Sequence, residues 1–162
     1  MKKAYLLLGS NVGNRRQNLL DALQHIENYA GKIAKHSSIY ETAPWGKPDQ
    51  QNFFNQAVLV ETLLEPPALM HELLNIERLM GRKRSENEKW EQRLIDIDIL
   101  FYNDVNLQTE QLTIPHPRLH ERNFALHPML ELDPTHKHPL KGQNIEELLQ
   151  ICSDTLLVTK IK

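Results

Sequence analysis

The chain has 162 residues, a length that suits one domain with its own hydrophobic core, and we expect residues 1–162 to form a single domain. Lysine and arginine number 19 and aspartate and glutamate 21, so the formal charge of −2 argues against a broad nucleic-acid-binding surface. The one cysteine, Cys152, excludes an intramolecular disulfide and a four-cysteine zinc site. The apolar run that ends at Gly9 is too short for a signal sequence, and no run approaches a membrane span, so we expect a cytoplasmic protein.

The first part of the chain predicts a strand, a loop and a helix. Residues 4–8 are apolar and end at a glycine, which indicates a buried strand followed by a turn. Asn14 and Gln17 have the spacing of a helix capping box, and apolar residues then recur at helical spacing as far as Gly31. The loop at 9–14 could hold a phosphate at the helix N-terminus. It has neither a Walker A nor a Rossmann pattern, so a plain turn fits it equally well.

Two strands separated by a long loop follow. Residues 33–40 predict a strand of mixed polarity, and residues 41–52 form a loop rich in proline, glycine and polar side chains. A loop of this length in a small domain favours a functional role, in which Trp45 would either anchor the loop or cover a ligand. The next strand opens with Phe53 and Asn55. An aromatic ring and an amide there suit a flat, hydrogen-bonding heterocycle, while core packing explains the aromatic ring equally well.

A second helix and a further strand complete a βαββαβ order. Glu65-Pro66-Pro67 begins a helix at a position where proline is tolerated, and apolar residues continue it to a stop at Gly81. With the strand that follows, the order predicts an α+β fold of the ferredoxin-like kind. We expect an antiparallel sheet, both helices packed on one face, and the remaining residues as a C-terminal extension.

The strand near residue 96 carries the clearest chemical signal in the sequence. Its side chains alternate, so one face is predicted to be apolar and consists of Ile95, Ile97, Ile99 and Phe101. The opposite face places Asp96 and Asp98 side by side, about 7 Å apart along the strand. Two like charges on a strand are unfavourable unless a cation offsets them. Magnesium suits the pair because it prefers oxygen ligands and is often shared with phosphates, although two solvated aspartates explain the pattern as well.

A basic segment lies immediately before this carboxylate pair. Its cationic residues are Arg82, Lys83, Arg84, Lys89 and Arg93. Arginine matches phosphate oxygens two at a time, so a basic loop that leads into two carboxylates favours a site for a metal and phosphates. The alternative is a solvated charged loop, because Glu86, Glu88 and Glu91 are interleaved and could neutralise it.

A second basic segment with an aromatic end runs from Leu112 to Phe124. His116 and His120 have the spacing of helical zinc ligands, but Pro115 and Pro117 argue against a continuous helix, so phosphate hydrogen bonding is favoured over zinc.

The remaining expectations are structural. Asn103-Asp104 predicts a hairpin turn, and His136 and His138 lie among prolines in an expected surface loop. Asn144 with Glu147 predicts the start of a last short helix. Residues 156–158 are expected to return to the sheet as an edge strand.

Four motifs in order resemble the 6-hydroxymethyl-7,8-dihydropterin pyrophosphokinases, folate-pathway enzymes that move pyrophosphate from ATP to a pterin alcohol. The motifs are Leu8-Gly9-Ser10-Asn11, then Tyr40-Glu41-Thr42-Ala43-Pro44 with Phe53-Phe54-Asn55, then Arg93-Leu94-Ile95-Asp96-Ile97-Asp98, and finally Leu112-Thr113-Ile114-Pro115-His116 with Arg122-Asn123-Phe124. The resemblance covers nearly the whole chain. It implies a single catalytic domain that uses ATP as co-substrate with two Mg²⁺ ions.

The resemblance also implies roles for individual residues. Asp96 and Asp98 would hold both magnesium ions. The other implied catalytic residues, which contact phosphates, are Arg82, Arg84 and Arg93. The implied nucleotide-binding residues are Glu77, Trp90, Ile99, Thr113, His116 and Arg122. The implied pterin-binding residues are Thr42, Ala43, Trp45, Phe53, Asn55 and Phe124, with the two phenylalanines on either side of the ring. A monomer without nucleic-acid or membrane partners is expected.

The chain departs from the family pattern at three places, and two other functions also fit parts of the sequence. Glu91-Gln92 replaces a frequent Gly-Pro, and Gln111 and Pro117 replace a frequent arginine and an aromatic residue. Gly9-Ser10 and the aspartate pair also resemble elements of nucleotidyltransferases, but these elements lie more than 80 residues apart here. A ferredoxin-like module that binds ATP without turnover is a third possibility.

Overall fold

Strand β1 (Lys2–Ser10) lies inside an antiparallel sheet, between β5 (Asp96–Tyr102) and β4 (Phe53–Thr62). The computed structural model describes residues 1–44, 50–81 and 94–161. Its elements, in chain order, are β1 (Lys2–Ser10), α1 (Arg15–Tyr29), β2 (Lys32–His36), β3 (Tyr40–Thr42), β4 (Phe53–Thr62), α2 (Pro66–Leu79), β5 (Asp96–Tyr102), β6 (Leu107–Gln108), β7 (Thr113–Ile114), the 3₁₀ turn η1 (Leu119–Glu121), α3 (Asn123–Leu132), α4 (Ile145–Ile151) and β8 (Val158–Lys160). The predicted α+β class and antiparallel sheet are confirmed.

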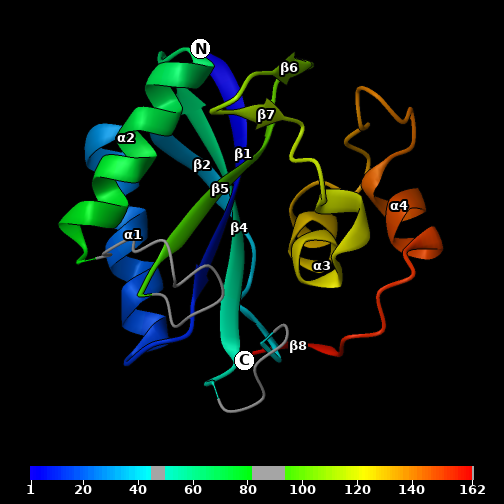
Figure 1. Cartoon of the computed structure of the whole chain (residues 1–162), viewed down its shortest axis with the longest axis horizontal. Helices are drawn as coiled ribbons and strands as arrows, with labels where there is room; N and C mark the ends of the chain where they lie inside the picture. Colours follow the sequence, from blue (N-terminus) through cyan, green and yellow to red (C-terminus); the bar gives the residue numbers. More distant parts are fainter. Residues whose placement is uncertain (45–49, 82–93, 162) are drawn as a thin grey trace.

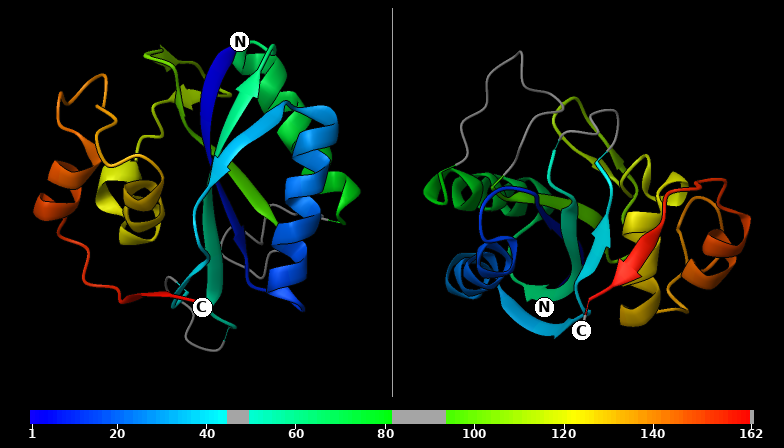
Figure 2. Two further views of the ribbon diagram at one scale, coloured as in Figure 1. Left: turned by 180° about the vertical axis from the view of Figure 1, so that it is seen from behind. Right: turned by 90° about the horizontal axis from the view of Figure 1, so that it is seen from below.

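The strand order of the main sheet is β5-β1-β4-β3-β8, and β2 also pairs with β4. Every pairing within it is antiparallel. The short strands β6 and β7 form a separate two-stranded ladder. Strand β8 therefore returns from the far end of the chain to cover β3 (Figures 1 and 2).

Helices cover both faces of the sheet, with α1 and α2 on one side and α3 and α4 on the other (Figure 1). Each face has its own core of buried apolar residues, because β1 alternates its side chains between Leu6 and Leu8 on the first face and Tyr5 and Leu7 on the second. The prediction that the first two helices share a face is confirmed. Within the described ranges, no helix has the length and apolar composition needed to cross a bilayer.

Helix α3 is an element that the sequence pattern did not predict. Its interior contains Pro128, which has no N–H for a helical hydrogen bond and normally ends a helix. The apolar residues on both sides of this proline are buried, and they pack with α4 against the second face. Tertiary packing therefore overrides the local signal at this proline.

The strand predicted at residues 33–40 is two strands, β2 and β3. Between them Ser37 leaves the ladder and bonds to β4 in another way. Its Oγ accepts from the backbone N–H of Ala57 at 3.0 Å, and its carbonyl accepts from Gln56 Nε2 at 2.7 Å. The N–H of Ser37 still donates to the carbonyl of Ala57 at 2.9 Å, but its side chain takes the place of its carbonyl in the return bond, which interrupts the regular pairing.

The predicted apolar face of β5 is correct up to Ile99 and wrong at Phe101. Tyr5 pairs with Phe101 and Leu6 with Ile99, so Leu100 is an extra residue in β5, as in a β-bulge. The bulge reverses the alternation, and Phe101 packs in the core beneath α3 instead of with the isoleucines. Asp96 precedes the bulge and pairs with Gly9.

The predicted local signals for helix starts and turns are largely confirmed. Asn14 Oδ1 accepts from the N–H of Gln17 at 3.1 Å, and Asn144 with Glu147 forms a complete capping box. Asn103 has a φ of 46°, as a turn requires, but β6 after it pairs with β7 and does not form a hairpin with β5. The edge strand lies at 158–160, two residues later than expected.

Residues 136 and 138 lie in a loop as predicted, but His138 is buried there and does not lie at the surface. His138 is 4% exposed, and its Nδ1 accepts from the N–H groups of Leu140 and Lys141, each at 3.2 Å. Phe101 packs beside both histidines, with ring centroids 4.4 Å and 5.7 Å away. Burial, with Lys141 as a further cause, lowers the pKa of His138 to about 4, so this ring is neutral in the folded protein at pH 7.

This histidine predicts a pH dependence of stability. The unfolded chain binds a proton at His138 below about pH 6.5 and the folded chain only near pH 4, so acidification through this window favours unfolding. We expect the free energy of unfolding in urea to fall less steeply between these pH values in His138→Asn, whose amide oxygen can accept the same N–H groups without titrating. Equal slopes for the two proteins would contradict this prediction.

Candidate active site

Four residues lie directly opposite one another across four strands, on the face that α3 covers. Asp96 pairs with Gly9, Gly9 with Asn55, and Asn55 with Tyr40. Directly opposed residues of antiparallel strands present their side chains to the same face. Strands lie about 4.8 Å apart, so the Cα atoms of Asp96 and Asn55 are separated by about 10 Å across a glycine. A carboxylate and an amide thus lie on one strip of this face of the sheet.

Gly9 leaves room on this strip for its neighbours. A Cβ at Gly9 would lie 3.1 Å from Asn55 Nδ2 and 3.8 Å from Phe53 Cδ1. The glycine therefore lets the amide and the aromatic ring lie over β1, next to each other. Thr42, which is 3% exposed, pairs with Phe53 and adds a buried polar residue to the same end of the site.

Asn55 is the most informative of these residues. It is 4% exposed, and among the described residues its Oδ1 has no hydrogen-bond partner. A buried acceptor without a partner costs about 1–3 kcal/mol, so folded proteins rarely retain one without a functional reason. A ligand with an N–H group would satisfy it.

Cationic and neutral nitrogen donors face the two aspartates from the segment before α3. Burial lowers the pKa of Arg122, while the charges of Asp98 and Asp96 oppose this shift. Its Cζ is 5.4 Å from the centre of the Phe124 ring. Arg122 therefore lies beside the aromatic ring and interacts electrostatically with the aspartates.

His116 is a neutral donor in the same group. Burial and the charge of Arg122 lower its pKa to about 4, although Asp96 opposes the shift. Its Nδ1 accepts from the N–H of Arg118 at 3.2 Å, so in the neutral ring the proton is on Nε2. Its own backbone N–H donates to the carbonyl of Leu100 at 3.0 Å, which fixes the segment to β5.

Glu77 of α2 and Ile99 of β5 lie where the helix packs against the strand. Glu77 is 2% exposed and its carboxylate accepts from the N–H of Ile97 at 2.8 Å. The side chain of Ile99 is buried in the core beneath α1 and α2, so only its main chain is available to a ligand. Thr113 is half-buried in β7.

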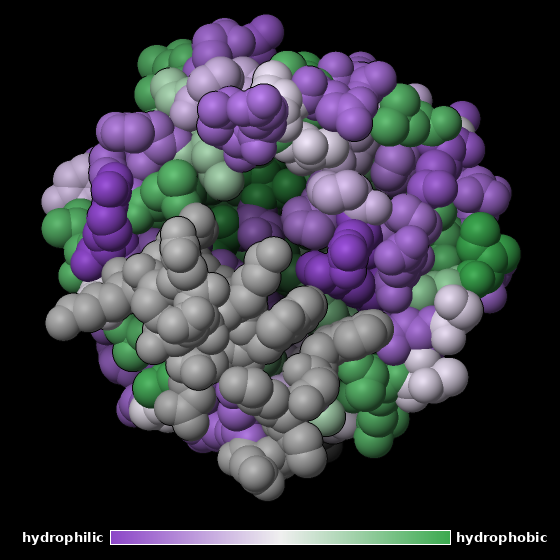
Figure 3. All heavy atoms as spheres, in the orientation of Figure 1, coloured by the Kyte–Doolittle hydropathy of each residue, from purple (hydrophilic) through white to green (hydrophobic). Residues whose placement is uncertain are grey.

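The remaining predicted residues divide into two groups. Ala43 is exposed just after β3, and Phe53 and Phe124 are half-buried at the site. Five predicted residues lie outside the described residues, namely Trp45, Arg82, Arg84, Trp90 and Arg93. The Glu91-Gln92 departure from the family pattern also lies outside them. The space-filling view shows the molecular surface hollowed near the middle of this view, with hydrophilic residues beside the hollow (Figure 3).

Sequence reasoning missed Tyr40 as a member of the site. Its side chain follows Asn55 on the strip, and its hydroxyl donates to Glu131 Oε2 of α3 at 2.6 Å. Burial, together with this carboxylate, raises the pKa of Tyr40. The two partners are 91 residues apart, and no local pattern links them.

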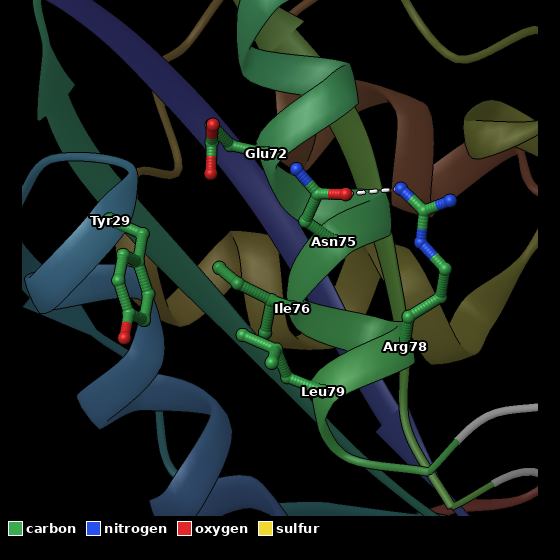
Figure 4. Close-up of a pocket in the computed structure, with 6 residues that line it drawn as sticks. All are labelled: Tyr29, Glu72, Asn75, Ile76, Arg78 and Leu79. Atoms are coloured by element: carbon green, nitrogen blue, oxygen red, sulfur yellow. Dashed lines mark hydrogen bonds between the residues drawn. The ribbon is translucent and has the colours of Figure 1, made fainter.

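A separate pocket of about 470 Å³ lies between α1 and α2 and has no part in this site (Figure 4). Tyr29 of α1 and residues of α2 line it, including Arg78, which donates to Asn75. None of the residues predicted for chemistry contributes to its walls.

Comparison with known proteins shows a similarity to one family of enzymes. Residues 5–134 match the family described as 7,8-dihydro-6-hydroxymethylpterin-pyrophosphokinase (HPPK). The chain belongs to the HPPK family. It is 40% identical over 147 residues to the 2-amino-4-hydroxy-6-hydroxymethyldihydropteridine pyrophosphokinase of Aquifex aeolicus, with 91% of this chain and 90% of that protein covered. The Bacillus subtilis protein of that name is 44% identical over 130 residues, with 80% of this chain and 77% of that protein covered.

The fold agrees with a solved HPPK structure. The crystal structure of a Plasmodium falciparum HPPK-DHPS triple mutant with STZ-DHP has a TM-score of 0.75 to this chain. The two are 21% identical, and the match covers 92% of this chain and 43% of that one. HPPK membership confirms the predicted activity, in which pyrophosphate is transferred from ATP to hydroxymethyldihydropterin in folate synthesis.

The position of Gly9 predicts a specific kinetic defect in this HPPK. An alanine there would push the Asn55 amide by a few tenths of an ångström. The resemblance implies that Asn55 and Phe53 bind the pterin, and displacing a binding contact weakens binding, so on that expectation Gly9→Ala should raise the pterin KM about tenfold. The ATP KM should change little.

Gly142→Ala is the control for this substitution. Gly142 has a φ of 73°, and a Cβ added there would have no atom within 4 Å, so alanine strains only a turn. It should lower the melting temperature and leave both KM values unchanged. A Gly9→Ala enzyme with wild-type pterin KM would show that Asn55 and Phe53 do not position the pterin.

Proposed function

We propose that ATP and the pterin bind side by side on the strip between β5 and β3, the pterin at Asn55 and the phosphates at Asp96 and Asp98. The observation that carries this proposal is the buried Asn55 oxygen, which has no partner among the described residues and lies two strands from Asp96 on one face. The separation of about 10 Å suits a bicyclic ring whose hydroxymethyl group extends toward the phosphates. The alternatives of a nucleotidyltransferase and a binding module have no comparable support.

The pterin lies between Phe53 of β4 and Phe124 of α3 in this proposal. Stacking between two aromatic side chains orients a flat heterocycle, and the Asn55 amide bonds to its polar edge. Thr42 and Ala43 extend the polar edge of the site from the end of β3. Trp45, outside the described residues, completes the set of proposed pterin contacts.

Asp96 and Asp98 are the proposed magnesium ligands. The described residues contain no group of three histidine, cysteine, aspartate or glutamate side chains able to hold a metal by themselves. Two carboxylates on one strand fit magnesium nevertheless, because this ion takes its other ligands from phosphates and water. When bound between these carboxylates and the phosphates of ATP, magnesium would neutralise the charge that develops during transfer.

The protein contributes positioning and charge to the transfer. His116 donates from Nε2 to a phosphate oxygen, and Arg122 stabilises negative charge next to the aspartates. We assign Glu77, the main chain of Ile99 and Thr113 to the nucleotide, with Trp90. Arg82, Arg84 and Arg93 are proposed to contact the phosphates. The pterin hydroxyl oxygen forms a bond to the β-phosphorus of ATP and gives up its proton to solvent water. The bond from the β-phosphorus to the oxygen shared with the α-phosphate breaks, and AMP leaves with that oxygen.

The finer architectural expectations belong to the same proposal. The sheet order β5-β1-β4-β2 with α1 and α2 on one face supports a ferredoxin-like core. Residues after β5 add α3, α4 and β8 to its other side, which supports a single catalytic domain with a C-terminal extension. A cytoplasmic monomer without nucleic-acid or membrane partners stays a prediction.

The test combines the purified chain, magnesium, ATP and 6-hydroxymethyl-7,8-dihydropterin, with the nucleotides separated by chromatography. AMP formed only in the presence of the pterin is the expected product. ADP would indicate γ-phosphoryl transfer instead, and intact ATP would favour a binding module. Omitting magnesium should abolish AMP formation, and AMP formed equally well without any divalent ion would exclude the proposed metal site.

A further inference from the structure

Arg15, the first residue of α1, makes three contacts with the two strands that carry the proposed pterin site. Its Nη1 donates to Glu41 Oε2 at 2.9 Å and to the carbonyl of Asn52 at 2.8 Å. Its Cζ lies 3.8 Å from the centre of the Phe54 ring. One guanidinium thus joins β3, the residue before β4, and a core aromatic ring.

These contacts lie directly behind the pterin residues. Glu41 and Phe54 are opposite each other in register, and Phe54 belongs to the core on the α1 face. On each side of this pair, Thr42 pairs with Phe53 and Tyr40 pairs with Asn55. Because neighbouring residues in a strand alternate, these flanking side chains face the opposite side of the sheet. Arg15 therefore supports from behind the strand segment that holds the pterin in front.

The hydrogen-bonded ladder between β3 and β4 is short, so further contacts that hold the two strands together matter more for their register. It contains only three residue pairs, and Thr42–Phe53 is the last of them. Beyond that pair the described main chain leaves the sheet at Ala43 and re-enters it at Phe53, directly after Asn52. Bonds from Arg15 to Glu41 and Asn52 fix both chain segments next to this terminal pair.

Lysine cannot make the same set of contacts. Arginine has a planar group that donates in fixed directions while it stacks on an aromatic face, whereas lysine has a compact charge on a flexible stem. The Arg15 side chain is 18% exposed, so its ion pair with Glu41 is partly shielded from solvent. Charge alone would not reproduce the geometry.

We infer that Arg15 is a positioning residue for the pterin, which acts by holding the Thr42–Phe53 end of the strand pair in register. The inference rests on the proposed pterin site at Phe53 and Asn55. Arg15 itself lies on the α1 side of the sheet and does not touch the substrate. Its loss should therefore affect pterin binding far more than ATP binding or the chemical step.

The experiment compares steady-state kinetics of Arg15→Gln and Arg15→Lys with the wild type, each substrate being varied in turn. We expect both variants to raise the pterin KM about tenfold, with kcat and the ATP KM within about twofold of wild type. Arg16→Gln is the matched control, because Arg16 is the next residue of α1 and is exposed. It should leave all three constants unchanged.

A double-mutant cycle with Glu41→Gln tests whether the two residues act as a unit. The pterin KM of Arg15→Gln/Glu41→Gln should equal that of Arg15→Gln alone, because the first substitution already removes the contact. Multiplicative effects would contradict the inference. Full rescue by Arg15→Lys would also contradict it, because charge alone would then be sufficient.

Phe53→Ala separates failure of this inference from failure of the proposed site. A raised pterin KM in Phe53→Ala with a normal one in Arg15→Gln would overturn the role of Arg15 and leave the site in place. An unchanged pterin KM in Phe53→Ala would overturn the site. If Arg15→Gln lowered the melting temperature and changed all three constants equally, Arg15 would be structural only and the inference wrong.

Discussion

Replacing Asp98 with asparagine is expected to lower kcat for AMP formation about a thousandfold. The amide keeps the shape of the side chain on β5 but removes one of the two charges that would hold magnesium against the phosphates. Charge stabilisation by such metals is worth several kcal/mol, and about 4 kcal/mol corresponds to a thousandfold. The measurement is kcat at saturating ATP and pterin, repeated over a range of magnesium concentrations, with a right-shifted magnesium dependence expected.

Asp104→Asn is the matched control for Asp98→Asn. Asp104 is an exposed aspartate in the turn that follows the same strand. Its substitution should leave kcat and the magnesium dependence within about twofold of wild type. An Asp98→Asn enzyme with more than a tenth of wild-type kcat would show that this carboxylate is not a metal ligand.

Asn55→Leu is expected to change stability and activity in opposite directions. Leucine removes a buried polar group whose oxygen has no partner among the described residues, so the ligand-free protein should gain about 1 kcal/mol in free energy of unfolding. The same change removes the proposed hydrogen bond to the pterin. We expect kcat/KM for the pterin to fall about a hundredfold. Urea denaturation and steady-state kinetics measure the two effects.

Gln56→Leu provides the control in the neighbouring position. Gln56 is also a buried amide, but its Nε2 donates to the carbonyl of Ser37 at 2.7 Å. Leucine there leaves that carbonyl without this donor, so stability should fall by about 1–3 kcal/mol while pterin kinetics change little. If Asn55→Leu were destabilising and fully active, Asn55 would be a structural residue and not a pterin contact.

Periodicity predicted most elements of this fold because apolar spacing is imposed by the core. The alternation of β5 and the helical stripe that ends at Gly31 both follow from burial on one face. The bulge at Leu100 and helix α3 could not be predicted in the same way. A bulge adds one residue without a sequence signature, and Pro128 opposes the helix that its neighbours form. At the bulge and in α3, core packing and not the local sequence pattern determines the structure.

The candidate site was predictable in its residues but not in its arrangement. Alternation placed Asp96 and Asp98 on one face, and the resemblance supplied Phe53, Asn55 and Phe124. Register alone shows that Asp96 and Asn55 face one strip across Gly9, because strand pairing between distant segments is a tertiary property. The support from Arg15 was not predicted either, because its partners lie 26 and 37 residues away.

The pairing of β8 with β3 has a consequence for synthesis on the ribosome. Val158 of β8 pairs with Thr42 of β3, a strand of the proposed site. The outer edge of β3 therefore stays unpaired until the ribosome has made a residue 116 positions further along the chain. At translation rates of about 5–20 residues per second, that interval is roughly 6–23 seconds. During it β3 has an unpaired edge, the kind of surface that pairs with other chains. The nascent chain is therefore most exposed to wrong strand pairing with other chains before β8 is made.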